Sequence, residues 1–193
     1  MKLAGVRAVL FDLDGTLADT APDLARALNR VRAEQGLAPL PSAIARPHTS
    51  SGARGLLKAG FDIAPEDEGY RALRDRFLDF YEKELCVETR LFDGIPELLV
   101  KIRARKLTWG IVTNKGRRFT EPLLRLLAAS LLSQPPADCL YIGDDLRDAQ
   151  AARAAGMHFA AAGWGYHGEG GDPDTWDADA VMSHPREILD LLS

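Results

Sequence analysis

Cysteines, aromatic residues and long apolar runs are all scarce in this chain of 193 residues. It has two cysteines, Cys86 and Cys139, which are too few and too isolated for a disulfide framework or a zinc site. Aromatic residues make up 7% of the chain, and no window approaches the 18 apolar residues of a membrane-spanning helix. We therefore expect a reduced, cytoplasmic compartment and no membrane partner.

The chain also lacks a large excess of one charge. It has 24 basic and 28 acidic residues, a net charge of −4, and no basic block long enough for a nucleic-acid surface. The first seven residues lack the apolar region of a signal peptide. Apolar residues at 46% and charged residues at 27% are ordinary for a globular protein and exclude a disordered or fibrous one. We expect a soluble protein without a nucleic-acid partner, built as one domain or as one domain with a smaller insertion.

Three short apolar runs each end in polar turn residues. They cover residues 6–11, 108–113 and 139–142, with weaker candidates at 158–162 and 180–182. Runs of this length are typical of buried strands in a parallel sheet. Apolar residues at helical spacing alternate with these runs. The alternation predicts an α/β fold, a parallel sheet covered by helices on both faces.

One long stretch interrupts this alternation. Residues 19–90 are mostly helical in pattern and contain no convincing strand. The simplest explanation is a helical subdomain inserted after the first strand. We therefore predict a core formed by residues 1–18 and 92–193, and an inserted helical domain formed by residues 19–91.

Acidic residues follow the first and third apolar runs. Asp12 and Asp14 are two positions apart, so in an extended chain their side chains point to the same side. Asp144 and Asp145 follow the third run, and Asp148 lies one turn into the next helix. The carboxyl ends of parallel strands meet at the edge where ligands bind. Converging carboxylates repel one another, and a hard cation such as Mg²⁺ relieves that repulsion.

The second run ends in Thr113, whose hydroxyl and neighbouring backbone N–H could hold a phosphate. A pair of acids at a strand end is by itself more often a turn former than a site. Here, however, the pair is joined by polar residues at two further strand ends. The combination predicts a metal-dependent, phosphate-binding site at one edge of the sheet.

The three motifs together resemble those of the haloacid dehalogenase-like superfamily. Its motifs I, II and IV are similar to residues 12–16 (Asp-Leu-Asp-Gly-Thr), 113–114 (Thr-Asn) and 143–145 (Gly-Asp-Asp). The helical insertion resembles the cap of its phosphoglycolate phosphatase and β-phosphoglucomutase branch. The pattern of residues 163–185 is also similar to bacterial N-acetylmuramic acid 6-phosphate phosphatases. The resemblance implies a Rossmann-like doubly wound core, an inserted helical cap and Mg²⁺-dependent phosphoryl transfer.

The resemblance also implies roles for the acidic residues. Asp12 would be the nucleophile that forms an aspartyl-phosphate, and Asp14 would be the general acid and then the general base. Mg²⁺ would be held by Asp12, the backbone carbonyl of Asp14, and Asp144. Asp145 and Asp148 would support the metal. This chemistry requires mainly positioning and charge neutralisation.

Three further residues are expected to bind the substrate. The resemblance implies that Thr113 and Asn114 bind the transferring phosphoryl group. In the cap, a glycine-containing turn at residues 50–55 would face the active site, and Arg54 would meet a carboxylate or sugar group. A solvent-exposed loop with a helix N-cap is the alternative interpretation of that turn.

The chain departs from the superfamily at motif III, a lysine that binds the phosphate and the nucleophile. Between Asn114 and Gly143 the only lysine is Lys115, which belongs to motif II. A βαβ-sized piece, on the order of 30 residues, is absent. Two interpretations stay open. Either an internal segment near Leu127–Ala128 is missing from the sequence, which we favour, or the chain is truly shortened and catalytically impaired.

We therefore expect a Mg²⁺-dependent phosphatase that acts on a small phosphorylated metabolite. A dehalogenase would not need the second carboxylate at Asp14, whereas a phosphomutase shares both acids and is excluded less well. Phosphoglycolate is the leading substrate, and N-acetylmuramic acid 6-phosphate is the first alternative. A phosphate-binding relative without turnover is the second. The chain is expected to be a monomer or a homodimer.

Overall fold

The computed structural model describes residues 3, 5–116, 118–120, 123, 136–168 and 170–192. The strands are β1 (Ala8–Phe11), β2 (Ala18–Asp19), β3 (Arg90–Leu91), β4 (Thr108–Ile111), β5 (Cys139–Gly143), β6 (His158–Ala162) and β7 (Ala180–Met182). The α-helices are α1 (Ala21–Glu34), α2 (Ser42–Ala45), α3 (Gly52–Phe61), α4 (Tyr70–Lys83), α5 (Ile95–Ala104), α7 (Leu146–Ala154) and α8 (Ile188–Leu191). Short 3₁₀ helices are η1 (Arg46–Ser51), η2 (Pro136–Asp138), η3 (Pro173–Thr175) and η4 (Pro185–Glu187).

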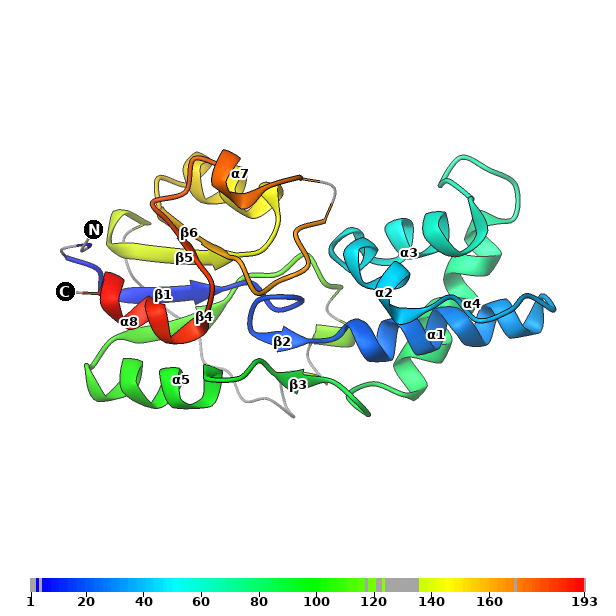
Figure 1. Cartoon of the computed structure of the whole chain (residues 1–193), viewed down its shortest axis with the longest axis horizontal. Helices are drawn as coiled ribbons and strands as arrows, with labels where there is room; N and C mark the ends of the chain where they lie inside the picture. Colours follow the sequence, from blue (N-terminus) through cyan, green and yellow to red (C-terminus); the bar gives the residue numbers. More distant parts are fainter. Residues whose placement is uncertain are drawn as a thin grey trace.

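Five of the strands form one parallel sheet in the order β4-β1-β5-β6-β7. Helices α5 and α8 cover one face of this sheet and α7 covers the other (Figure 1). Both faces are therefore buried, which explains why the strands consist of nearly continuous apolar runs. The predicted α/β fold, a doubly wound parallel sheet, is confirmed.

Helices α1 to α4 lie together at the far end of the molecule from the two chain termini (Figure 1). They share their own apolar cluster, which is separate from the core of the sheet and includes Leu28, Leu57, Phe77 and Tyr81. In α1, Pro22 stands in the first turn, and the buried Leu24, Leu28 and Val31 recur at helical spacing.

The short strands β2 and β3 join these helices to the sheet. They pair in antiparallel register, with Ala18 opposite Leu91 and Asp19 opposite Arg90. Both connections between the two parts of the molecule therefore run side by side (Figure 1). The division into a core and a cap at residues 18–19 and 91–92 stays a prediction.

Two expectations from the sequence concern the chain from β4 onward. The strand expected over residues 108–113 ends at Ile111, so Thr113 lies in the loop that follows β4. The expected interruption near Leu127–Ala128 lies outside the described residues. Among the helices that the structure describes, none is both long and apolar enough to cross a membrane.

Candidate active site

The candidate site lies where strands β1, β4 and β5 end. In the parallel register Phe11 is opposite both Ile111 and Ile142, so the three strands end at the same level. The backbone N–H of Asp12 continues this ladder by donating to the carbonyl of Ile142 at 2.8 Å. The sheet therefore brings the loops after its three central strands to one edge, as expected for a parallel sheet that binds a ligand there.

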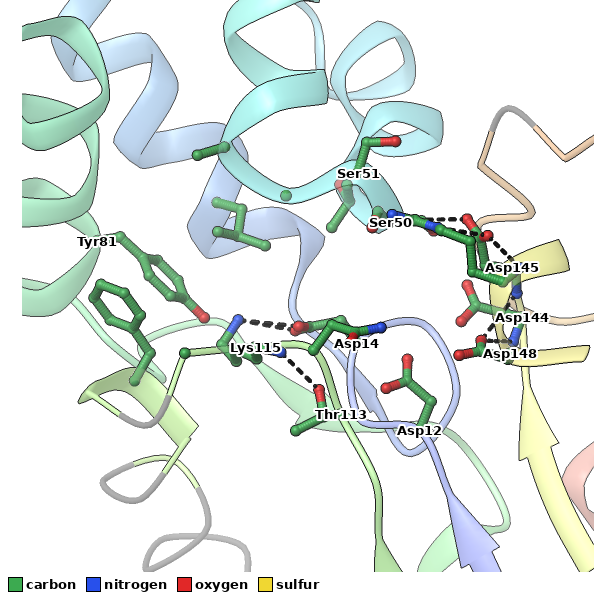
Figure 2. A pocket seen from close by; sticks show the side chains of 18 of the residues that line it. Asp12, Asp14, Ser50, Ser51, Tyr81, Thr113, Lys115, Asp144, Asp145 and Asp148 are labelled. Atoms are coloured by element: carbon green, nitrogen blue, oxygen red, sulfur yellow. Dashed lines mark hydrogen bonds and ion pairs between the residues drawn. The ribbon is translucent and has the colours of Figure 1, made fainter. Parts of the chain in front are cut away.

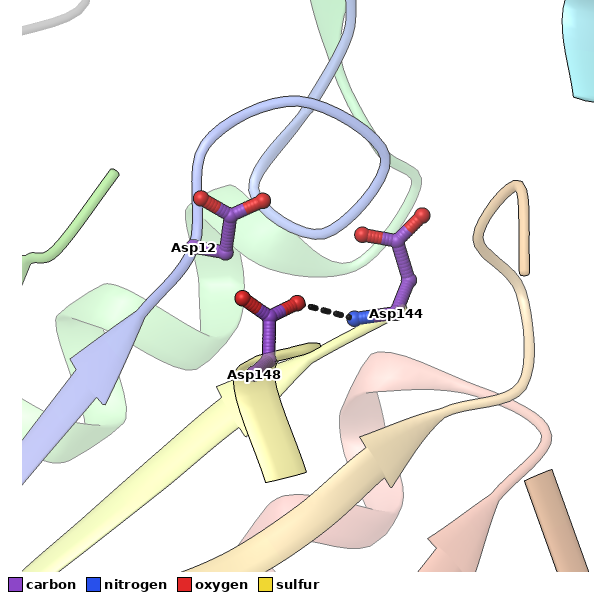
Figure 3. Close-up of side chains that lie close together, drawn as sticks. All are labelled: Asp12, Asp144 and Asp148. Carbon is purple, nitrogen blue, oxygen red and sulfur yellow. Dashed lines mark hydrogen bonds between the residues drawn. The ribbon is translucent and has the colours of Figure 1, made fainter. Parts of the chain in front are cut away.

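Three carboxylates meet at this edge (Figure 3). One carboxylate oxygen from each of Asp12, Asp144 and Asp148 lies within 4.8 Å of the others. Asp12 follows β1, Asp144 follows β5, and Asp148 lies in the first turn of α7. Three oxygen ligands from two strand ends and one helix form a donor set that suits a hard divalent cation.

Ionisation of all three carboxylates in this cluster is unfavourable when no cation balances their charges. Burial raises the pKa of Asp12 well above its ordinary value, and the charges of Asp148, Asp144 and Asp14 raise it further. Burial likewise raises the pKa of Asp144 to about 7, even though the backbone N–H of Tyr166 stabilises its charged form. Burial also raises the pKa of Asp148. A bound divalent cation would stabilise all three charged forms, so the residues fit a metal site.

Asp145 and Asp148 form the N-terminal capping box of α7. The side chain of Asp145 accepts from the backbone N–H of Arg147 at 2.9 Å, and Asp148 Oδ2 accepts from the backbone N–H of Asp145 at 3.2 Å. Asp148 Oδ2 also accepts from the backbone N–H of Asp144 at 3.2 Å. Helix capping thus fixes Asp148 beside Asp144, whereas Asp145 turns away to form an ion pair with Arg147.

Close approach of the backbone to Asp144 requires glycine at position 15. Gly15 has a φ of +85°, and a Cβ atom there would lie 2.2 Å from Asp144 Oδ2. Any other side chain would therefore push the carboxylate away from the cluster. Beside it, the hydroxyl of Thr16 donates to Asp144 Oδ1 at 3.1 Å and helps to orient it.

Asp14 stands apart from the three-carboxylate cluster and is paired with Lys115 (Figure 2). The ammonium of Lys115 lies 3.0 Å from Asp14 Oδ1 and 3.2 Å from Oδ2. The hydroxyl of Thr20 also donates to Asp14, at 2.5 Å. Burial disfavours the charge on Lys115, but the negative charge of Asp14 outweighs this effect and raises the pKa of Lys115 above its ordinary value. Lys115 is therefore a buried, charged lysine at neutral pH.

The loop after β4 carries the expected phosphate-binding residues. The hydroxyl of Thr113 accepts from the backbone N–H of Lys115 at 3.2 Å, which holds this loop in a tight turn beside Asp14. Thr113 and Asn114 both line the same cavity as Asp12 and Asp14. The structure thus brings the expected phosphate-binding and catalytic residues around one space.

That cavity has a volume of about 250 Å³ and lies between the sheet edge and the helical segment. Its far wall includes the hydroxyl-bearing residues Ser50 and Tyr81 (Figure 2) and also Thr49. Each of these side-chain oxygens is buried. The hydroxyls of Thr49 and Ser50 have no partner among the described residues, whereas the hydroxyl of Tyr81 stands beside the ammonium of Lys115. Burial raises the pKa of Tyr81 to about 12, so its hydroxyl stays neutral. These groups are available to a ligand.

The position of Arg54 differs from that expected of a substrate-binding residue. Arg54 is exposed on α3 and is not among the described residues that line the cavity. Helix α3 buries Gly55, Leu56 and Leu57 instead, which turns Arg54 toward solvent. The turn that was expected to face the site does line the cavity, through residues 50–53 and together with Thr49. The sequence gives no periodic signal that distinguishes Thr49 from an exposed turn residue.

Comparisons with known proteins agree with this geometry. The family model described as haloacid dehalogenase-like hydrolase matches residues 6–156. An N-acetylmuramic acid 6-phosphate phosphatase of Pseudomonas aeruginosa is 39% identical, over 100% of this chain and 97% of the relative. A phosphoglycolate phosphatase of Xanthomonas campestris is 38% identical, over 94% of each chain. The crystal structure of a predicted phosphoglycolate phosphatase from Haemophilus somnus has the same fold. It superposes with a TM-score of 0.80 at 22% identity and covers 97% of this chain and 98% of its own.

The alignment with the Pseudomonas relative is longer than this chain. It spans 219 positions against 193 residues, so at least 26 positions have no counterpart here. That difference is close to the size of the piece expected to be absent between motifs II and IV. The extent of the family match and of the alignments shows that this chain belongs to the haloacid dehalogenase-like hydrolase family.

Proposed function

We propose that this chain is a Mg²⁺-dependent phosphatase that hydrolyses a small phosphomonoester of the phosphoglycolate type through an aspartyl-phosphate on Asp12. The observation that carries the proposal is the shared cavity. Asp12 and Asp14 line it together with Thr113, and Asp144 and Asp148 stand beside Asp12. The helices of residues 19–91 form the cap that closes over this space.

The reaction needs two displacements. In the first, a carboxylate oxygen of Asp12 attacks phosphorus and the ester P–O bond breaks, while Asp14 donates a proton to the leaving oxygen. In the second, water attacks the phosphorus of the aspartyl-phosphate and gives a proton to Asp14. Inorganic phosphate leaves, and Asp12 is restored as a carboxylate. In this proposal Thr113 donates its hydroxyl to the phosphoryl group in both displacements.

Asp12, Asp144 and the backbone carbonyl of Asp14 would hold Mg²⁺, with Asp148 beside the two carboxylates as a further candidate ligand. When bound, the ion offsets the negative charge that the nucleophile and the phosphoryl group share. Asp12 is buried among other carboxylates, so without a cation it resists ionisation and is a poor nucleophile. The proposal therefore requires that activity depend on a divalent metal.

The size of the cavity favours a small substrate. Its volume of about 250 Å³ is below the roughly 300–1,000 Å³ of pockets that bind drug-sized ligands. Relatives named phosphoglycolate phosphatase at 38% identity support the same conclusion. Two relatives named N-acetylmuramic acid 6-phosphate phosphatase, at 39% and 38%, support the amino-sugar phosphate as the second candidate.

The lack of a lysine after Lys115 and before Gly143 supports a further candidate, a relative that binds phosphate without turning it over. The mass of the protein expressed from its gene separates this candidate from the phosphatase. A mass near 21.1 kDa supports a chain that is truly shortened and does not turn phosphate esters over. A clearly heavier protein would show that an internal segment is missing from the sequence, and it would support the phosphatase.

Steady-state assays test the proposed function. Hydrolysis of an aryl phosphate should require Mg²⁺ and disappear in Asp12→Asn. The values of kcat/KM for phosphoglycolate and N-acetylmuramic acid 6-phosphate then rank the two substrates. Activity that survives Asp12→Asn would disprove the nucleophile assignment.

A further inference from the structure

Lys115 is the most buried cation on the cavity wall. Its side chain is 7% exposed, compared with 46% for Arg147, the other basic residue among the described lining residues. The guanidinium of Arg147 is directed to both carboxylate oxygens of Asp145 and to the carbonyl of Ser50. Lys115 is therefore the cation best placed to meet a negative charge inside the cavity.

The ammonium of Lys115 has more N–H donors than its carboxylate partner Asp14 has oxygens. Asp14 supplies two oxygens, at 3.0 and 3.2 Å, and an ammonium group carries three N–H donors. Its other polar neighbour among the described residues is the hydroxyl of Tyr81, so Asp14 is the one carboxylate that meets this ammonium. A neutral hydroxyl is a weaker acceptor for an ammonium than a carboxylate, so the position favours an anionic ligand.

Tyr81 stands directly beside this ammonium. Its ring centroid is 4.7 Å from the ammonium nitrogen of Lys115, and its hydroxyl points toward Lys115 (Figure 2). Tyr81 is 1% exposed, and its hydroxyl oxygen interacts with Lys115, while its O–H has no acceptor among the described residues. Lys115 comes from the loop after β4 and Tyr81 from α4, so the pair joins the sheet edge to the helical segment.

The pair lies next to the leaving-group side of the site. Asp14, as general acid, must come within about 2.6–3.2 Å of the ester oxygen that leaves. Lys115 lies a similar distance from the same carboxyl group, on the side away from the Asp12, Asp144 and Asp148 cluster (Figure 2). A group carried on the carbon next to the ester oxygen would therefore fall within reach of Lys115 and Tyr81.

We propose that Lys115 and Tyr81 form a carboxylate subsite that selects phosphomonoesters with a carboxylate on the carbon attached to the ester oxygen. The ammonium of Lys115 donates to one carboxylate oxygen and the hydroxyl of Tyr81 donates to the other. Phosphoglycolate has this arrangement. In N-acetylmuramic acid 6-phosphate the carboxylate lies on a lactyl group at another carbon of the sugar. This inference rests on the proposed phosphatase function.

The test compares two substrates that differ only in the carboxylate, phosphoglycolate and 2-hydroxyethyl phosphate. We expect the wild-type protein to prefer phosphoglycolate by about 10²-fold in kcat/KM, because charge-assisted hydrogen bonds are lost with the neutral ester. Lys115→Met should reduce this ratio to about one. Tyr81→Phe should reduce it by about 10-fold, and Lys115→Arg should keep part of it.

Lys101→Met is the matched control, because Lys101 is exposed on α5 and distant from the site. It should leave the ratio unchanged. Equal hydrolysis of the two esters by the wild-type protein would overturn the subsite without requiring any variant to fold. An unchanged ratio in a folded Lys115→Met protein would also overturn it, since Lys115 would then act on the phosphoryl group or on Asp14. If the wild-type protein hydrolyses neither ester and no aryl phosphate, the proposed function itself fails.

Discussion

The backbone N–H of Tyr166 donates to Asp144 Oδ2 at 2.7 Å. The hydroxyl of the same tyrosine accepts from the backbone N–H groups of Thr20 at 2.8 Å and Ala21 at 3.1 Å, and it donates to Asp19 at 2.8 Å. One residue therefore connects the carboxylate cluster to β2 and to the first turn of α1. The α1 helix has no side-chain N-cap, and Tyr166 satisfies N–H groups at its start.

Replacing Tyr166 by phenylalanine should destabilise the protein but spare the metal site. The change leaves two buried N–H groups without their acceptor, so the free energy of unfolding should fall by about 1–3 kcal/mol. The backbone bond to Asp144 remains, and Mg²⁺ affinity should change little. Urea unfolding and calorimetric Mg²⁺ titration measure the two effects. Tyr70→Phe, at a buried tyrosine of α4 away from the site, is the control. Equal stability of Tyr166→Phe and wild type would contradict this role.

Gly15→Ala should damage the carboxylate cluster as well as the backbone. Gly36→Ala provides a matched control, because Gly36 also has a positive φ, of +68°, but a Cβ atom there meets nothing within 4 Å. Both variants carry the strain of a positive φ. Only Gly15→Ala should also displace Asp144 and weaken Mg²⁺ binding, by roughly 10–100-fold as for other groups that orient metal ligands. Calorimetric titration measures the Mg²⁺ affinity of both variants. Equal affinities would show that Gly15 does not help to position Asp144.

Stability without a divalent metal should fall as the pH rises. The pKa of Asp144 is raised to about 7, and those of Asp12 and Asp148 are also raised, so the folded protein binds more protons than the unfolded chain. The stabilising contribution is complete below pH 3.8, the ordinary pKa of an aspartate, and is lost as the pH rises through about 7.

Thermal melts in a chelating buffer at pH 5 to 8 test this dependence. Tm should decrease over that range, and Mg²⁺ should raise it most at pH 8. Asp12→Asn removes one buried charge, so the decrease should be smaller in that variant. A Tm in chelator that is independent of pH, or that rises with pH, would show that folding does not raise the pKa values of these carboxylates.

The sheet and the acidic residues could be predicted from the sequence because their signals are local. The apolar run that contains β1 ends directly before Asp12, and the parallel arrangement follows from the alternation of strands and helices. The acids at positions 12, 14, 144 and 148 follow strand ends or open a helix, so their approximate meeting place was predictable. The two-residue strands β2 and β3 were not, because two residues carry no periodic pattern.

The rest of the site depends on contacts between distant segments. Tyr81 has the spacing of an inward-facing helical residue, and nothing in that spacing shows that its hydroxyl reaches Lys115. The resemblance predicted that the turn at residues 50–55 faces the site, and Ser50 does line the cavity, whereas Arg54 faces solvent. Which side chain of this turn enters the cavity is set by tertiary packing and not by local sequence.

In the proposed reaction Asp12 carries the phosphoryl group during turnover. Rapid quenching of the Mg²⁺-loaded protein with phosphoglycolate, followed by mass spectrometry of its peptides, tests this role. We expect a transient phosphoryl group on Asp12 that forms and decays at rates compatible with kcat and is absent in Asp12→Asn. Turnover with no phosphorylated peptide, or with the phosphoryl group on another residue, would contradict the role of Asp12.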